Sequence, residues 1–224
     1  IQDYDEAIRL DPKFSLAHQD RGAAHYFKKD YERAIKDYDE AIKLDPRSSR
    51  AYSNRGAAYK KLGRAAQALA DEDQAIKLDP NDPTYFDNRG LTYAEEGQYD
   101  RAIMDFNEAI RISPRAKFLT NRGNAYQSKE QYDRAIADYN RAIKRDPTNA
   151  NTWNNRGAAF RILRIDRRAL AVGEVEIAHH RVRFPQHVVA VDQRRHAAVG
   201  IHGEIFRRVV LAERHAGVDP GVGD

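Results

Sequence analysis

Carboxylates and histidines are the side chains of this 224-residue chain with the greatest capacity for chemistry. Adjacent acids such as Asp71, Glu72 and Asp73 could act as a general acid and base. With 34 Asp and Glu on helical surfaces, however, neighbouring carboxylates arise by chance. Six of the eight histidines lie near the C-terminus: His179, His180, His187, His196, His202 and His215. Their spacings of 1, 7, 9, 6 and 13 residues place no i,i+4 pair on one helix, so we expect no metal site.

Other signatures of catalysis or ligand chemistry are missing from the sequence. There is no G-x-S-x-G, phosphate-cradling G-x-x-x-x-G-K or H-E-x-x-H motif, and no Cys. The absence of Cys fits a reducing compartment, and we expect a cytoplasmic protein. Lys and Arg alternate with acids and the net charge is only +4, which argues against nucleic-acid binding. No uncharged apolar run approaches the roughly 20 residues of a membrane-spanning helix. We therefore predict neither an enzyme nor a cofactor.

The elements that position the polar residues are repeated along the chain. Asp-Pro or Ser-Pro recurs at Pro12, Pro46, Pro80, Pro114 and Pro147, with spacings of 34, 34, 34 and 33. We expect a half repeat over 1–12, full repeats over 13–46, 47–80, 81–114 and 115–147, and a partial repeat over 148–171.

Each repeat contains the pattern of two helices. In the first full repeat, one apolar stripe advances by 3, 1, 3, 3 and 1 residues through Tyr31, Ala34, Ile35, Tyr38, Ala41 and Ile42. That period predicts a helix that buries one face. The helix should end before Pro46, which cannot continue the backbone ladder. A pair of 34 residues cannot bury both apolar stripes alone, so the pairs must stack into an all-α solenoid.

The recurring residues resemble the tetratricopeptide repeat (TPR) family, from residue 1 to residue 171. Its pattern of Gly, aromatic, Ala, aromatic, Ala and Pro is repeated several times in register. The positions that carry the signature are Gly22, Gly56, Gly90, Gly123, Gly157, Tyr59, Tyr93, Tyr126, Ala34, Ala68, Ala102, Ala135, Pro46, Pro80, Pro114 and Pro147. The resemblance implies a right-handed superhelix of antiparallel helix pairs. Gly56 lies in mid-helix, which indicates a close approach to the partner helix at Ala68.

Three departures from the family pattern carry information. Glu72 stands where the neighbouring repeats have Tyr38, Phe106 and Tyr139. It marks either sequence drift, with a locally less stable position in the array, or a carboxylate that faces a ligand. His25 replaces the first-helix aromatic, and we expect it to be packed or half-exposed. Arg replaces the usual Leu before each Gly, at Arg21, Arg55, Arg89, Arg122 and Arg156. We interpret this Arg ladder as hydrogen bonds between repeats to acids such as Asp37 and Asp105, with partner contact as the alternative.

Members of this family hold an extended peptide or a partner helix in a concave groove lined by the first helix of each pair. On a helical wheel, a second stripe of those helices lies more than 90° from the packed stripe. This stripe and a flanking Asn ladder supply the predicted peptide-binding residues Ser53, Asn54, Lys60, Asp87, Asn88, Leu91, Thr120, Asn121, Asn124, Gln127, Asn154, Asn155 and Arg161. Asn and Gln can pair with peptide N–H and C=O groups. The alternative is a solvated surface without a dedicated ligand.

The resemblance therefore implies a non-catalytic protein–protein interaction scaffold, with an extended peptide or helix of a partner protein as its ligand. Relatives that clamp chaperone C-terminal tails carry lysines at positions where this chain has Gln19, Ser53, Asp87, Thr120 and Asn154, so we predict against such tails. The alternative function is a docking module of an enzyme whose catalytic domain lies outside this sequence.

Residues 172–224 differ in composition from the rest of the chain. All 11 Val lie there, whereas all 12 Tyr precede residue 140. We expect a poorly ordered or non-native segment, for example an out-of-frame reading; an appended domain with short strands at 175–177 and 188–191 is the alternative. The sequence opens at Ile1 without Met or a signal peptide, so we expect the native N-terminus to lie upstream.

Overall fold

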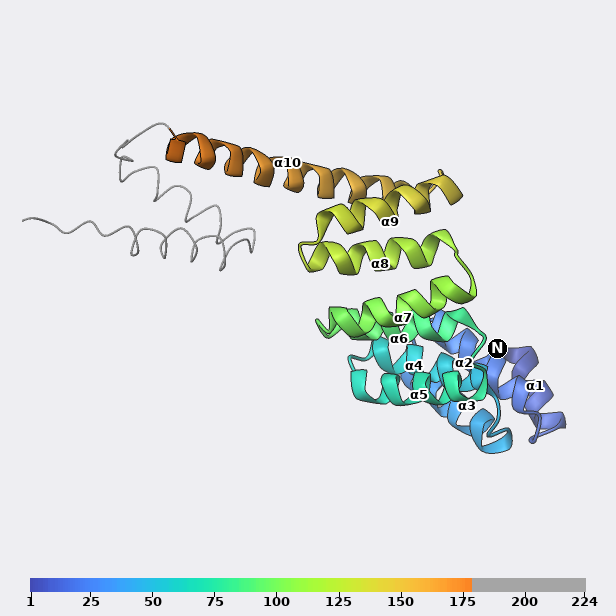
Figure 1. Ribbon diagram of the computed structural model, residues 1–224. Coiled ribbons are helices and arrows are strands. Elements are labelled where there is room, and N and C mark those ends of the chain that lie inside the picture. The colour runs from blue at the N-terminus through green and yellow to red at the C-terminus, as the bar shows by residue number, and fades with distance from the viewer. Residues whose placement is uncertain (179–224) are drawn as a thin grey trace, which may run out of the picture. The chain divides into compact units, whose positions relative to one another are not determined.

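The computed structural model describes residues 1–178 of the chain. Within that range the protein consists of helices joined by short turns, as Figure 1 shows. The helices are α1 (Gln2–Leu10), α2 (Ser15–Phe27), α3 (Tyr31–Leu44), α4 (Ser49–Lys61), α5 (Ala65–Leu78), α6 (Pro83–Glu95), α7 (Tyr99–Ile112), α8 (Ala116–Ser128), α9 (Tyr132–Arg145) and α10 (Ala150–Ala178). The all-α prediction is confirmed for this part of the chain.

The chain divides into two compact units, residues 1–168 and 169–224, and the first unit carries the repeats. In it, α2 packs on α3, α4 on α5, α6 on α7 and α8 on α9, and each pair also contacts the next pair. Figure 1 shows these helices following one another in chain order. Contacts between α2 and α4, α4 and α6, and α6 and α8 place the first helices side by side. We call the surface formed by these first helices and the start of α10 the first-helix face.

The hydrophobic core of the first unit lies between repeats. Ala34, Ile35 and Tyr38 of α3 pack with Ala58 of α4, which begins the next repeat. The same arrangement recurs between α7 and α8 and between α9 and the start of α10. In these places the second helix of one pair is buried against the first helix of the next pair, as the stacking argument requires.

Close packing explains why glycine, which has no Cβ, occurs in the middle of the first helices. A Cβ on Gly90 would lie 2.8 Å from the Phe106 ring, and one on Gly22 would lie 2.8 Å from the Tyr38 ring. At Gly56 a Cβ would meet the Ala68 carbonyl oxygen at 3.2 Å. The predicted close approach at Gly56 is therefore confirmed, although most of the glycines make room for an aromatic ring.

The last described helix departs from the pattern of pairs. In the complete repeats, the turn between the two helices contains a residue with positive φ: Lys29, Gly63, Gly97 or Glu130. In the fifth repeat, by contrast, α10 runs as one helix of 29 residues to Ala178. Residues 175–177 are therefore helical, and a strand there is ruled out. The expectations for 179–224, including the histidines, lie outside the described residues, and the repeat boundaries remain predictions.

Candidate functional site

The predicted peptide-binding residues divide into two groups by exposure. Ser53, Asp87 and Thr120 are buried, with 4%, 0% and 9% of their surfaces exposed. The remaining members are partly or fully exposed: Asn54, Lys60, Asn88, Leu91, Asn121, Asn124, Gln127, Asn154, Asn155 and Arg161. Only this second group can meet a partner without rearrangement. Whether any of them binds a peptide remains a prediction.

The Asn ladder links neighbouring first helices. The Asn88 side-chain nitrogen donates to Ser53 Oγ over 3.1 Å, and Asn121 donates to Asp87 Oδ1 over 2.6 Å. Near the end of the array, Asn155 donates to Asn124 Oδ1 over 2.9 Å. Each bond joins one repeat to the preceding one, so these amides hold the first helices in register as well as lining the surface.

Two fully or mostly buried charges on the first-helix face, Asp87 and Lys60, have partners of opposite charge that are exposed. Asp87 is fully buried, and Lys117 Nζ lies 2.8 Å from its Oδ2. Lys60 Nζ lies 3.8 Å from Glu95 Oε1. Burial lowers the pKa of Lys60, while the charges of Glu95 and Glu72 act in the opposite direction.

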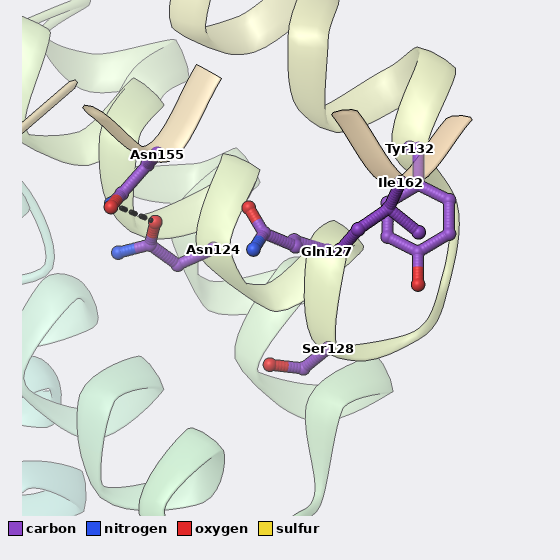
Figure 2. Close-up of a pocket in the computed structure, with 6 residues that line it drawn as sticks. All are labelled: Asn124, Gln127, Ser128, Tyr132, Asn155 and Ile162. Atoms are coloured by element: carbon purple, nitrogen blue, oxygen red, sulfur yellow. Dashed lines mark hydrogen bonds between the residues drawn. The ribbon is translucent and has the colours of Figure 1, made fainter. Parts of the chain in front are cut away.

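A pocket of about 300 Å³ opens where α8, α9 and α10 meet. Figure 2 shows the residues that line it: Asn124, Gln127, Ser128, Tyr132, Asn155 and Ile162. The helical wheel predicted Asn124, Gln127 and Asn155, and the structure brings these three together. The helical wheel did not predict Ser128, Tyr132 and Ile162. Ser128 is the last residue of α8 and Tyr132 belongs to α9, a second helix, so neither lies on the predicted stripe of the first helices.

Hydrogen bonds at the pocket fix the direction of its amides. The Tyr139 hydroxyl lies 2.8 Å from Asn124 Oδ1 and 2.9 Å from Gln127 Oε1. Asn124 Oδ1 also accepts from Asn155, so its oxygen is occupied and its NH2 group is a donor without a partner among the described residues. The pocket thus offers hydrogen-bonding groups beside the apolar surfaces of Tyr132 and Ile162, a combination typical of ligand sites.

The Arg ladder bridges acids within and between repeats. Arg55 Nε and Nη2 donate to Asp71 over 2.8 and 2.7 Å, and its Nη1 donates to Asp39 of the preceding repeat over 2.6 Å. Arg21 and Arg89 repeat this arrangement. For these three arginines the prediction of such bonds is confirmed, with one correction: Asp37 and Asp105 lie in the same repeat as their arginines, and the bonds between repeats reach Asp5, Asp39 and Asp73. Arg122 and Arg156 reach an amide of the preceding repeat instead, Asn107 and Asn140.

Glu72 is the most unusual group of the array. Only 1% of it is exposed, so the ligand-facing interpretation is wrong. Its carboxylate accepts from Ser53 Oγ over 3.0 and 3.2 Å. Burial raises its pKa to about 8, because the charged form loses its hydration. His25, the other departure from the family pattern, has a packed side chain that is 13% exposed, as expected.

Among the described residues, no helix combines the length and apolar character needed to cross a membrane. In the same part of the chain, His, Asp and Glu form no cluster of three or more suited to a metal ion.

Comparison with known proteins identifies the family. One tetratricopeptide repeat model matches residues 49–82 and 116–149, a second matches 73–104, and a TPR repeat model matches 27–63. Together with the stacked helix pairs, these matches show that the chain belongs to the tetratricopeptide repeat family. No curated protein matches the sequence.

Solved structures agree on the fold. A thermophilic TPR protein of Thermus thermophilus, TTC0263, is 20% identical with a TM-score of 0.63, over 70% of this chain and 87% of that one. MamA is 23% identical with a TM-score of 0.60, over 66% and 87%. YrrB, described as a TPR protein with an unusual peptide-binding site, is 18% identical with a TM-score of 0.59, over 72% and 84%. The predicted TPR solenoid is therefore confirmed for the described residues.

Proposed function

We propose that this chain is a non-catalytic protein–protein interaction scaffold whose first-helix face binds an extended segment of a partner protein. The family and the fold support the scaffold role. The pocket at Asn124, Gln127 and Asn155 is the observation that carries the finer proposal. The peptide-binding site in the name of YrrB is consistent with it.

The pocket is suited to one side chain of the partner together with its neighbouring peptide group. Its volume of about 300 Å³ stands at the small end of the range for ligand sites. Tyr132 and Ile162 supply an apolar wall for the side chain. The free NH2 group of Asn124 can donate to a peptide carbonyl, whatever the sequence of the partner. Apolar burial then provides affinity, and the amides provide orientation.

Filling the pocket tests the proposal directly. Ser128 is the last residue of α8, is exposed and lines the pocket, so Ser128→Trp should occupy the space with little effect on the array. A peptide array would first identify a binding sequence, and fluorescence anisotropy would then measure its Kd. We expect Ser128→Trp to weaken binding at least about tenfold, equivalent to about 1.4 kcal/mol.

Lys36→Trp is the matched control, because Lys36 is an exposed residue of α3, a second helix. This variant should bind as tightly as the wild type. Equal binding by wild type and Ser128→Trp would refute the pocket as the site, and an array without any bound peptide would refute the extended-segment proposal.

A further inference from the structure

Glu72 occupies a position that belongs to an aromatic ring elsewhere in the array. It lies 34 residues after Tyr38 and 34 before Phe106, two of the largest fully buried side chains. Its Oε1 lies 3.3 Å from the point where a Cβ on Gly56 would be, so the carboxylate packs against the same glycine face as those rings. A titratable group thus replaces an apolar one in the interior of the second repeat.

Ser53 connects this carboxylate to the first-helix face. Its hydroxyl donates to Glu72 over 3.0 and 3.2 Å, and its oxygen accepts from the Asn88 side-chain nitrogen over 3.1 Å. Glu72 and Ser53 are buried, whereas Asn88 is partly exposed. The Glu72–Ser53–Asn88 chain therefore runs from α5 through α4 to α6 and ends at a residue of the predicted binding surface.

The chemistry of the three groups determines the direction of their hydrogen bonds. An ionised carboxylate can only accept, so Ser53 must donate its single hydrogen to Glu72. The Ser53 oxygen then accepts from the Asn88 NH2 group, which turns Asn88 Oδ1 away from the chain; that oxygen has no partner among the described residues. A neutral carboxyl can instead donate to Ser53, whose hydrogen becomes available to Asn88 Oδ1 after a half-turn of the amide.

We propose that Glu72, acting through Ser53, determines which end of the Asn88 amide faces a partner, so that partner recognition at Asn88 is linked to a proton. With Glu72 ionised, Asn88 presents an acceptor suited to a partner N–H group. With Glu72 neutral, it presents a donor suited to a partner C=O group. The consequence for recognition rests on the proposed function of this face, whereas the linkage itself is a property of the free chain.

The surroundings of Glu72 allow both protonation states near neutral pH. The charged and titratable groups around it and its neighbour Lys60 are Arg55, Lys60 and Lys61 of α4, Asp71 of α5, and Tyr85, Asp87 and Glu95 of α6. Burial raises the pKa of Glu72 most strongly, and Asp71 raises it further. The Ser53 hydroxyl, the charge of Lys60 and the Asn88 amide, which also interacts with the carboxylate directly, lower it, and the balance lies at about 8.

NMR titration of the ligand-free full chain tests the linkage without any partner. The carboxyl carbon of Glu72 and the side-chain NH2 group of Asn88 would be followed through the pH range around 8. We expect the two signals to titrate with one midpoint. In Glu72→Gln, the Asn88 signal should lose this transition, whereas Glu96→Gln, which removes an exposed acid of the same region, should retain it.

Ser53→Ala distinguishes two ways in which Glu72 could affect Asn88: through the hydrogen bonds of the Ser53 hydroxyl, or through space by the charge of the carboxylate. In this variant Glu72 should still titrate, while the change in the Asn88 signal should be clearly smaller than in wild type, because only the direct interaction between the two side chains remains. An Asn88 signal that is flat through the Glu72 transition in wild type, or one that follows Glu72 equally well in Ser53→Ala, would overturn the proposal. If Ser53→Ala does not fold, the comparison of wild type with Glu72→Gln decides the linkage. Because no peptide is used, failure of the proposed function would leave this result intact.

Discussion

Replacing Glu72 by Gln should stabilise the protein, by an amount that increases with pH. The pKa of Glu72 is about 8 in the folded chain, against 4.5 for an ordinary Glu. Between those values the folded state binds more protons than the unfolded state, so stability falls as pH rises from 4.5 towards 8. Below 4.5 the carboxyl is neutral in both states and contributes no such loss.

The magnitude follows from the two pKa values. From 4.5 to about 7 the unfolded group ionises while the folded group remains mostly neutral, and each pH unit costs about 1.4 kcal/mol. The penalty is therefore on the order of 3 kcal/mol at neutral pH. Gln has nearly the same shape and can still accept from Ser53, but it has no charge to desolvate.

Urea unfolding followed by circular dichroism, at several pH values between 4.5 and about 8, would measure the effect. The free energy of unfolding of Glu72→Gln minus that of wild type should increase steadily over this range. Glu96→Gln removes an acid that is exposed and should give a nearly constant difference. The reasoning is refuted if the Glu72→Gln difference does not change with pH, or if Gln destabilises the chain at neutral pH.

Four further substitutions test the close contacts, the backbone strain and the ion pairs of the array. Gly90→Ala places a Cβ 2.8 Å from the Phe106 ring and should cost about 1–3 kcal/mol in urea unfolding; an unchanged midpoint would contradict the close contact. Lys29→Gly should stabilise by up to about 1 kcal/mol, because Lys29 has a φ of 63°, and a lower melting temperature would argue against strain there. Arg55→Ala should cost about 3 kcal/mol, because it leaves a buried carboxylate unpaired. Arg33→Ala, at an exposed pair, should cost less than about 0.5 kcal/mol, and equal losses for the two arginines would refute the importance of burial.

Much of the fold could be predicted from the sequence because its contacts are local. Pro46 and Pro80 mark the period, and the stripe from Tyr31 to Ile42 identifies a buried helix face. In a solenoid each pair contacts only its neighbours, so a pattern of 34 residues contains most of the packing information. The Arg ladder was also interpretable, since an arginine and an acid 16 residues apart recur in several repeats.

The candidate site was only partly predictable. A helical wheel gives the direction of a side chain around its own helix, but not how closely the next first helix approaches. Ser53, Asp87 and Thr120 were therefore expected on the surface and instead lie buried between helices. The pocket depends on side chains from three helices, and a pattern within one helix cannot show how three of them meet.

The sequence by itself determined the family, the period of the array and the classes of chemistry that its motifs do not support, because those properties depend on residue types at fixed local spacing. The tertiary structure decided which polar residues remain free to meet a partner and which are used between repeats. It also decided that Glu72, which replaces the aromatic residue of the family pattern, has its carboxylate buried. Burial and hydrogen-bond partners depend on the distance between neighbouring helices, and that distance follows from the packing of whole repeats.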